Sequence, residues 1–467
     1  MADLLLASNR GPVSYVDGDD GHLHPQRGGG GLVSALSCAV ASAPRAAWVC
    51  AAITDADRRA VRSGLVDVPG VRLLDIDPVT LDRAYNRVAN SLLWFVSHLL
   101  CSTATGPTFD AGSRREWAGY VAYCTAFADA LAEDASPGAQ VLVQDYHLTL
   151  VPRLLRERRP DLRIAHFSHT PWAPPQYFRI LPDDVAREVL TGLLGADSVG
   201  FLSPRWADAF GRCCADVLGA EWDGRTVRYE GRTTRVRVHA LGVDGVQLHE
   251  RAAQPDVVGR LESVREAVGD CQLLLRVDRT ELSKNIVRGL QAYAELLRTR
   301  PEWRERVVHL AFAYPSRHDL PEYREYTAAV QRTAREVNEE FGTPSWLPVQ
   351  LEVRDDYPRS LAAFQLADVL LVNPLRDGMN LVAKEGPVLA RDGVALVLSR
   401  EAGAADELGD DALLVNPYDV SQTAEALHAA LSMAPAERAA RSARMAAVAT
   451  ALPPAQWLSE QLEGLRA

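Results

Sequence analysis

The amino-acid sequence predicts an α/β protein built of two doubly wound, Rossmann-like domains that face each other across a cleft. Its 467 residues exceed the length of about 250 to 300 residues at which one hydrophobic core stops growing. In both halves, short apolar runs alternate with longer stretches of helical periodicity, as is typical of parallel strands joined by crossover helices. A glycine-containing break at residues 238–245 separates the halves. We therefore predict domains over residues 1–240 and 241–452, with a C-terminal helix at 453–467 that packs back on the first.

The predicted strands are short apolar runs bounded by turn residues. In the first half they lie at residues 4–7, 141–144, 163–168 and 198–202, with helices at 182–194 and 204–218. In the second half they lie at residues 272–277, 307–313, 349–353, 368–373, 394–399 and 412–416. Ligands of doubly wound sheets bind outside the carboxyl ends of the strands, so the loops that follow these strands are candidate binding loops.

Composition restricts the partners and the location of the protein. The net charge of −11 at pH 7 disfavours nucleic acid and anionic membrane as partners. The N-terminal segment lacks the apolar run of a signal peptide, and residues 91–102 are too short to span a bilayer, so we expect a cytoplasmic protein. Seven cysteines without CxxC spacing or a Cys/His cluster indicate reduced core thiols, and we expect neither a metal nor another cofactor. The oligomeric state stays open, a homo-oligomer included.

The first candidate loop follows the strand at residues 4–7. It contains Ser8-Asn9-Arg10 and then four glycines at 28–31, which lead into a predicted helix at 33–43. Successive glycines before a helix let backbone N–H groups approach a phosphate, although a flexible surface turn is the alternative. Because neither G-x-G-x-x-G nor G-x-x-x-x-G-K-[ST] occurs, an NAD dehydrogenase and a P-loop protein are not supported.

Two further loops of the first half carry groups that suit sugar hydroxyls. Asp145 lies in Gln144-Asp145-Tyr146-His147 at the end of one strand, and His169 follows the next. A carboxylate accepts two hydrogen bonds, whereas an imidazole can donate one and accept another. A lone Asp or His at a strand end is more often structural, so each residue by itself is only a candidate ligand.

Two loops of the second half match an anionic sugar donor. Arg279 and Lys284 lie five residues apart in a strand-to-helix turn, so both cations can converge on one diphosphate at a helix N-terminus. Solvated surface charges are the alternative. The later run RDGMNLVAKE places Asp377 in a loop and Glu385 two turns into the next helix. The first carboxylate can hold sugar hydroxyls, and the second a ribose.

Taken in order along the chain, these residues resemble the trehalose-6-phosphate synthases. The resemblance covers nearly the whole chain and is carried by Ser8-Asn9-Arg10, Gly28 to Leu32, Tyr85-Asn86 through Trp94, Asp145-Tyr146-His147, His169 to Pro174, Arg279 with Lys284, Ser316-Arg317 and Arg376 to Glu385. It implies a retaining glycosyltransferase of the GT-B fold, whose N-terminal domain binds the acceptor and whose C-terminal domain binds the nucleotide sugar. Its small-molecule substrates would be a nucleoside-diphosphate glucose and glucose 6-phosphate, and its product α,α-trehalose 6-phosphate.

The resemblance also implies roles for individual residues. The donor diphosphate would be held by Gly30, Gly31, Arg279 and Lys284. The transferred glucose would be held by His169, Asp377 and the backbone of Met379, Asn380 and Leu381, with Glu385 on the ribose. The acceptor phosphate would be held by Arg10, Tyr85 and Arg317, with Trp94 and Asp145 against the acceptor sugar. The residues expected to act in catalysis are Asp145, His169, Arg279, Lys284 and Asp377.

The predicted mechanism is electrostatic. No pair of carboxylates presents itself as the acid and nucleophile of a double displacement. The leaving diphosphate oxygen would then take the acceptor's proton, while Arg279 and Lys284 stabilise the charge on the leaving group without an obligatory metal. Two arginines, one from each domain, would clamp the acceptor phosphate when the cleft closes.

The sequence departs from the family at a few positions. Glu281 and Asn285 stand where the family usually has Asp and Gly, which puts the detailed fit around the diphosphate in doubt. The donor base is expected to meet residues 353–356, where Arg354 and Asp355 match the acceptors and donors of guanine. We therefore predict a preference for GDP-glucose over UDP-glucose.

Two other functions remain open. A pseudo-glycosyltransferase would couple a nucleotide-activated cyclitol to an aminocyclitol phosphate on the same scaffold, and the intact DGMNLVAKE run and both clamp arginines disfavour it. A non-catalytic sugar-phosphate sensor is disfavoured because Arg279, Lys284 and Asp377 are all present.

Overall fold

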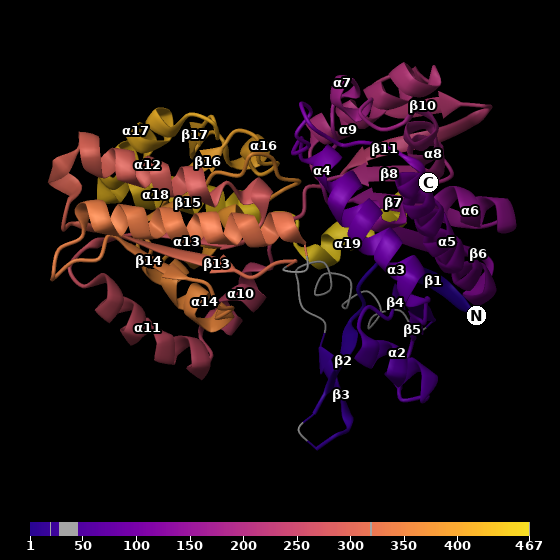
Figure 1. Ribbon diagram of the computed structural model, residues 1–467, viewed down its shortest axis with the longest axis horizontal. Coiled ribbons are helices and arrows are strands. Elements are labelled where there is room, and N and C mark those ends of the chain that lie inside the picture. The colour runs from indigo at the N-terminus through magenta and orange to yellow at the C-terminus, as the bar shows by residue number, and fades with distance from the viewer. Residues whose placement is uncertain (19, 28–44, 318–319, 467) are drawn as a thin grey trace. The chain divides into compact units, whose positions relative to one another are not determined.

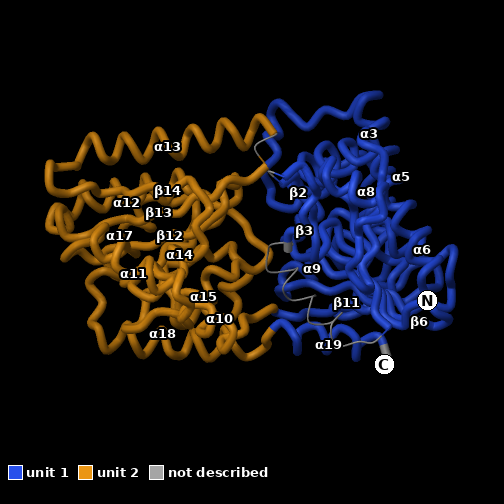
Figure 2. Tube along the Cα trace, turned by 90° about the horizontal axis from the view of Figure 1, so that it is seen from below, with its two compact units in different colours: residues 1–240, 454–467 blue, residues 241–453 orange. Residues whose placement is uncertain are grey.

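The computed structural model describes residues 1–18, 20–27, 45–317 and 320–466. The chain divides into two compact units, which Figure 2 colours separately. Unit 1 comprises residues 1–240 together with 454–467, and unit 2 comprises residues 241–453. In the described parts of the chain, no helix is both long and apolar enough to cross a membrane.

The described residues of unit 1 form a nine-stranded sheet (Figure 1). In sheet order, its strands are β5 (Val71–Leu74), β4 (Ala46–Ala51), β1 (Ala2–Ala7), β6 (Ala135–Gln144), β7 (Arg163–Ser168), β8 (Ser198–Phe201), β11 (Arg232–Val238), β10 (Thr226–Tyr229) and β9 (Glu221–Trp222). The strands from β5 to β11 are parallel, whereas β10 pairs antiparallel with both of its neighbours. A separate antiparallel hairpin joins β2 (Val13–Asp17) to β3 (Leu23–Arg27).

Helices connect the strands of unit 1. They are α2 (Asp55–Arg62), α3 (Pro78–Leu81), the π-helix η1 (Asp82–Leu93), α4 (Trp94–Ser97), α5 (Ala111–Asp134), η2 (Tyr146–Leu148), α6 (Val151–Arg158), α7 (Pro175–Phe178), α8 (Asp183–Leu193), α9 (Pro204–Cys213), η3 (Cys214–Leu218) and α19 (Pro454–Arg466). The longest, α5, begins at a capping box in which Asp110 and Ser113 satisfy each other's backbone N–H groups. The C-terminal α19 contacts unit 1 through hydrogen bonds from Gln140 to Leu462 O and from Trp457 to His239 O.

Unit 2 has a sheet that is parallel throughout its described length. In sheet order, its strands are β14 (Val349–Glu352), β13 (Val307–Tyr314), β12 (Gln272–Arg279), β15 (Val369–Val372), β16 (Ala395–Ser399) and β17 (Leu413–Val415). Its helices are α10 (Gly245–Ala252), α11 (Pro255–Val268), η4 (Leu282–Lys284), α12 (Ile286–Thr299), η5 (Pro301–Trp303), α13 (Pro321–Phe341), α14 (Tyr357–Leu366), α15 (Val382–Leu389), α16 (Ala405–Leu408), α17 (Val420–Leu431) and α18 (Pro435–Ala449).

Helices cover both faces of the sheet of unit 2. Val369 and Leu371 of β15 belong to a buried cluster with side chains of α12, α13 and α17. Leu370 lies between them in sequence, and its side chain fills the space beside Gly386 of α15. Successive strand residues point to opposite faces, so α15 covers the face that α12 does not. A strand buried on both faces is apolar at most of its positions, which explains the continuous run Val369–Val372.

The strand order creates a switch point in each sheet. In unit 1, β1 lies between β4 and β6, so the chain leaves β1 toward one edge of the sheet and later returns to build the other. In unit 2, β12 takes the same place between β13 and β15. The loops after the two central strands diverge at a switch point and leave a crevice for ligands. The sites to inspect are therefore the loops after β1 and β6 and those after β12 and β15.

The predicted fold class is confirmed, because both units are doubly wound α/β sheets. All ten strands predicted from the sequence are present, with ends that differ by a few residues. Strands β2 to β5 and β9 to β11 carry no prediction. Most of them are short or interrupted by polar residues, whereas β4 is an unbroken apolar run, AAWVCA, that the strand prediction missed. The predicted helix at 33–43 and the glycine run that includes Gly30 and Gly31 lie outside the described residues.

Candidate functional site

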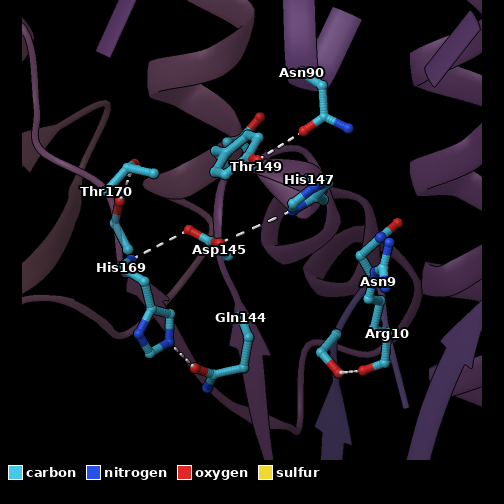
Figure 3. A network of polar contacts seen from close by, with 12 residues as sticks. Asn9, Arg10, Asn90, Gln144, Asp145, His147, Thr149, His169 and Thr170 are labelled. Carbon is cyan, nitrogen blue, oxygen red and sulfur yellow. Dashed lines mark hydrogen bonds and ion pairs between the residues drawn. The ribbon is translucent and has the colours of Figure 1, made fainter. Parts of the chain in front are cut away.

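The loop after β1 is held in one conformation by polar side chains. Ser8 Oγ accepts a hydrogen bond from Trp48 Nε1 at 2.7 Å and donates one to Arg10 O at 2.6 Å. Asn9 Oδ1 accepts one from Tyr123 OH at 2.6 Å. Figure 3 shows Asn9 and Arg10 beside the residues that follow β6. Ser8 and Asn9 are buried, whereas Arg10 is exposed and carries the charge of the loop.

Asp145 follows β6 and has an unusual backbone conformation. Its φ of 71° and ψ of 171° lie in a region that is occupied almost entirely by glycine. Its carboxylate accepts the backbone N–H of His169 at 3.2 Å, and its Oδ2 lies 4.0 Å from His147 Nδ1 (Figure 3). Its carbonyl oxygen lies 3.1 Å from His166 Nε2. Neighbouring strands therefore hold a strained aspartate at the switch point.

His169 is a neutral hydrogen-bonding group. Burial, together with the nearby His166, lowers the pKa of His169 to about 3. Its Nε2 lies 2.9 Å from Gln144 Oε1, the contact that Figure 3 draws beside Asp145. With the amide oxygen as acceptor, His169 donates from Nε2 and keeps a lone pair on Nδ1. The imidazole is then suited to accept a hydrogen bond from a hydroxyl rather than to supply a positive charge.

The π-helix η1 and α4 bring two predicted acceptor residues to unit 1. Tyr85 OH accepts a hydrogen bond from Arg10 Nη2 at 3.2 Å, and its ring stacks on His147 with centroids 5.7 Å apart. Tyr85 and Arg10 can thus contact one ligand. Trp94 is only 3% exposed, and the centroids of its indole ring and of the His98 ring lie 4.2 Å apart. The structure therefore offers no broad open face of Trp94.

In unit 2, the loops after β12 and β15 meet in an ion pair. Lys284 Nζ donates to Asp377 Oδ2 at 2.6 Å, and both side chains are about 15% exposed. Asn380 Nδ2 donates to the same oxygen at 3.1 Å, while Asn380 Oδ1 accepts the N–H of Ala383 in the first turn of α15. Burial favours the neutral form of Lys284, but the carboxylates of Asp377, Asp278 and Glu281 together raise its pKa. The ammonium is therefore charged.

The segment from Met379 to Leu381 presents free backbone donors. Within the described part of the chain, the N–H groups of Met379, Asn380 and Leu381 form no hydrogen bond. Met379 and Asn380 are buried, and a buried N–H without a partner is costly. Asn380 also has a φ of 80°, which only a few non-glycine residues adopt. Three unpaired donors at the start of a helix form a site for the oxygen atoms of a ligand.

The second predicted cation, Arg279, has an acidic neighbour. Its Nη2 lies 3.4 Å from Glu281 Oε1, and the Arg279 side chain is 62% exposed, so it can reach a ligand. Glu281 is buried and accepts a hydrogen bond from Ser316 Oγ at 3.0 Å. Burial would raise the pKa of Glu281, but Arg279, Arg317 and Lys284 lower it to about 2. Glu281 is therefore a buried anion close to the side chains of Arg279, Arg317 and Lys284.

Left-handed backbone conformations gather in these loops. Seven non-glycine residues in the described part of the chain have a positive φ, and four of them are Asp145, Asn285, Arg317 and Asn380. Asn285 has a φ of 58° at the start of α12, and its side chain donates to Asn373 O and Pro417 O. Asparagine tolerates this conformation better than most residues, so Asn285 can serve where the resembling family has glycine.

Glu385 lies in the first turn of α15, not two turns into the helix as expected, because α15 begins only at Val382, and it has no charged partner among the described residues. No described side chain pairs with it, and burial raises its pKa to about 7. Burial, and after it the nearby charge of Glu385, raises the pKa of Tyr357, so Glu385 lies near the start of α14. Arg354 and Asp355 precede α14 and are exposed. The predicted ribose and base ligands therefore lie near one another in unit 2.

Sequence reasoning missed two buried cations of unit 2. Lys384 is fully buried and donates to Glu407 Oε2 at 2.6 Å and to Leu241 O at 2.9 Å. The whole sequence contains only two lysines, Lys284 and Lys384, beside many arginines. That scarcity was the signal for Lys384. The second cation, Arg276, interrupts the apolar run of β12 and is fully buried.

A sequence model of glycosyltransferase family 20 matches residues 3–467 of the chain. The bifunctional trehalose-6-phosphate synthase/phosphatase of Thermoproteus tenax is 35% identical over 379 residues, which are 79% of this chain and 51% of that protein. The validamine 7-phosphate valienyltransferase of Streptomyces hygroscopicus subsp. jinggangensis is 32% identical over 486 residues, covering 100% of this chain and 95% of that one. The chain thus spans about half the length of the first relative.

A solved structure extends the likeness to three dimensions. The UDP-forming α,α-trehalose-phosphate synthase of Burkholderia xenovorans, in complex with glucose-6-phosphate, superposes with a TM-score of 0.85 at 27% identity. The match covers 100% of both chains. It confirms the predicted two-domain GT-B fold class.

Proposed function

The chain belongs to glycosyltransferase family 20, and from this premise we propose that it is a retaining glucosyltransferase that makes α,α-trehalose 6-phosphate. The donor is a nucleoside-diphosphate glucose, and the acceptor is glucose 6-phosphate. The observation that carries the proposal is the cluster at the switch point of unit 2. There Lys284, Asp377 and the unpaired N–H groups of residues 379–381 bring a cation, a carboxylate and backbone donors together.

We assign the donor to unit 2 and His169. Arg279 and Lys284 bind the diphosphate, because exposed or part-exposed cations suit an anionic ligand in an acidic protein. Gly30 and Gly31, which lie outside the described residues, are assigned to the diphosphate from the sequence alone. The glucose contacts Asp377, His169 and the N–H groups of residues 379–381. Glu385 binds the ribose, since a carboxylate without a protein partner can accept two hydroxyls.

The acceptor phosphate contacts Arg10, Tyr85 and Arg317. Arg10 and Tyr85 already share a hydrogen bond, and a phosphate beside them gains charge-assisted contacts. Asp145 contacts the acceptor sugar, and its strained backbone is typical of residues held for a function. Trp94 acts through packing around this sugar, because its ring is buried.

The chemistry proposed for these residues is a single group transfer. The bond between glucose C1 and the β-phosphate oxygen breaks, and a bond forms between C1 and the acceptor's O1 on the same face of the sugar. The acceptor proton passes to the departing phosphate oxygen. Lys284 and Arg279 stabilise the charge that develops there, and no step requires a metal.

A product assay tests the proposed function. The protein is incubated with radiolabelled nucleotide-glucose and glucose 6-phosphate, and a phosphorylated, non-reducing disaccharide is expected. A protein that gives no such product with any nucleotide-glucose would overturn the proposal. Binding of glucose 6-phosphate without turnover would instead favour the sensor.

The donor base is a separate proposal. Arg354 and Asp355 are exposed before α14, on the side of Glu385, and offer the donors and acceptors that guanine requires. We therefore propose that GDP-glucose is the better donor, although the Burkholderia xenovorans protein is named as UDP-forming. Turnover is compared with both donors at equal concentration. A clear preference for UDP-glucose contradicts this assignment.

One relative favours a second candidate function. The match to the validamine 7-phosphate valienyltransferase covers 95% of that protein, so a reaction that joins cyclitols fits the same scaffold. The distinguishing experiment offers the protein a nucleotide-activated cyclitol with an aminocyclitol phosphate. Faster turnover of this pair than of nucleotide-glucose with glucose 6-phosphate would make the cyclitol reaction the function.

Replacing Arg317 by alanine is expected to raise the KM for glucose 6-phosphate by about tenfold to a hundredfold, because a hydrogen-bonded charge is lost from the phosphate. The KM for the donor should change by less than about threefold, a small difference on the same scale. Steady-state kinetics with each substrate varied in turn give both values. Arg335→Ala, an exposed position on α13, is the matched control. Equal effects on both substrates would contradict the placement of Arg317 at the acceptor phosphate.

Donor binding is expected to weaken as the pH falls through about 7, the value to which burial raises the pKa of Glu385. Above this pH the carboxylate is ionised and accepts ribose hydroxyls, whereas below it one oxygen carries a proton. The apparent donor affinity should therefore drop up to about tenfold per pH unit below 7. Titration calorimetry from pH 5.5 to 8.5 measures the profile. Glu385→Gln should remove this pH dependence, and an unchanged profile would show that another group titrates.

A further inference from the structure

A fully buried arginine, Arg276, stands three residues before the end of β12. The side chain of Arg276 is 0% exposed, and its Nε finds no partner among the described residues. Burial of His309, and to a smaller extent the charge of Arg276, lower the pKa of His309 to about 3. Burying a guanidinium is costly, and an apolar side chain of similar size is often as stable or more so. Stability alone therefore does not account for an arginine here.

The guanidinium connects three segments of the donor half. Arg276 Nη1 donates to Asp278 Oδ2 at 2.8 Å and to Lys284 O at 3.2 Å. Its Nη2 donates to Asn373 Oδ1, just after β15. The first contact lies on β12, the second in the loop that carries the catalytic cation, and the third where the chain leaves for Asp377. One side chain thus links both loops of the switch point.

Other contacts make this link specific. The same two loops are joined by a hydrogen bond from Leu375 N to Ser283 O at 2.7 Å and by one from Asn285 Nδ2 to Asn373 O at 3.0 Å. Gly289 of α12 leaves the space that the guanidinium occupies, since a Cβ at this position would overlap Arg276 Nη2. Gly289 and Arg276 therefore depend on each other.

We propose that Arg276 is a positioning residue that holds the Lys284 loop and the Asp377 loop in register for the donor. The inference rests on the proposed glucosyl transfer, because it assigns Lys284 and Asp377 to the diphosphate and the glucose. Arg276 itself touches neither substrate. It acts by keeping the Lys284 ammonium and the Asp377 carboxylate at the separation seen in the ion pair, and a displacement of about 1 Å at such groups can cost about a hundredfold in rate.

The first test replaces Arg276 by methionine and by lysine. Arg276→Met should raise the donor KM and lower kcat, each by about tenfold, while the KM for glucose 6-phosphate stays within about twofold. Arg276→Lys keeps the charge but reaches fewer of the three acceptors, so it should fall between methionine and wild type. A role in stability alone would lower Tm and the active fraction, yet leave the donor KM unchanged. That last outcome overturns the proposal.

A second variant covers the case in which Arg276→Met does not fold. Gly289→Ala removes no hydrogen-bonding group, but its Cβ would displace the Arg276 guanidinium. It should therefore raise the donor KM by about three- to tenfold. In a background without Arg276 the same alanine should have little effect, because the two sites are in contact. Gly259→Ala is the control, since a Cβ there meets nothing within contact distance. An equal effect of Gly289→Ala in both backgrounds contradicts the proposal.

Calorimetric titration with UDP and with GDP separates this inference from the proposed function. A wild type that binds nucleotide but makes no disaccharide phosphate overturns the proposed function, and Arg276→Met should still weaken nucleotide binding by about tenfold. A wild type that turns over normally together with an Arg276→Met variant of unchanged donor KM and nucleotide affinity overturns the positioning role alone. A wild type that binds neither nucleotide overturns both.

Discussion

Replacing Lys284 by methionine is expected to lower kcat by about a hundredfold to a thousandfold, the effect of removing one group that stabilises transition-state charge. The ammonium is held 2.6 Å from Asp377, and three carboxylates keep its pKa raised, so it is a fixed cation at the predicted leaving group. Methionine preserves the length and the packing of the side chain. The glucose 6-phosphate KM should hardly change, because Lys284 belongs to the donor half.

Lys284→Arg is the matched control for charge. A guanidinium restores the positive charge but not the compact shape of the ammonium, so kcat should recover only in part. Chemical acetylation, which removes the positive charge of a lysine, offers an independent test, since the sequence has only two lysines and Lys384 is fully buried. Modification of Lys284 should inactivate the enzyme, and nucleotide-glucose should protect it. A methionine variant with wild-type kcat would remove Lys284 from the mechanism.

Replacing Asp377 by asparagine is expected to lower kcat/KM for the donor by about a hundredfold. The substitution removes a charged hydrogen-bond acceptor, worth roughly 1.5 to 3 kcal/mol, and also leaves the Lys284 ammonium without its closest anion. The lysine can then turn away from the position that it holds in the ion pair. Kinetics with the donor varied at saturating glucose 6-phosphate measure the loss.

Asp392→Asn is the control for the Asp377 variant, because Asp392 is an exposed aspartate beyond the other end of α15. The double variant Lys284→Met with Asp377→Asn should lose much less than the product of the two single losses, since residues in direct contact act as a unit. Fully multiplicative losses would show that the two residues act independently, which contradicts their joint role at the donor.

Much of the candidate site follows from the sequence because it lies in loops that end strands. The apolar runs before Asp145, Arg279 and Asp377 locate strand ends, and the parallel α/β pattern places ligands beyond them. The family resemblance then supplied the division of roles between donor and acceptor, and the family is confirmed over residues 3–467. The individual residue roles, the donor base and the absence of a metal remain predictions.

Other features could not be read from the sequence, since they depend on contacts between distant segments. Lys284 and Asp377 are 93 residues apart, and their ion pair appears only when β12 and β15 become neighbours in the sheet. The same holds for Arg276 with Asn373, and for the buried indole of Trp94, which was expected against a sugar ring. The local sequence shows which residue types are present. It does not show the partners that set their charge and exposure.

The sequence by itself determined the two α/β domains, the strand ends and the candidate loops, because hydrophobic periodicity and turn residues act over a few positions. Only the tertiary structure decided which side chains share a site. The strand orders place β1 beside β6 and β12 beside β15, which brings the loops of each unit together. Burial and neighbouring charges then set the protonation of Lys284, His169 and Glu385. Burial and contacts between segments that are distant in the sequence exist only in the folded chain.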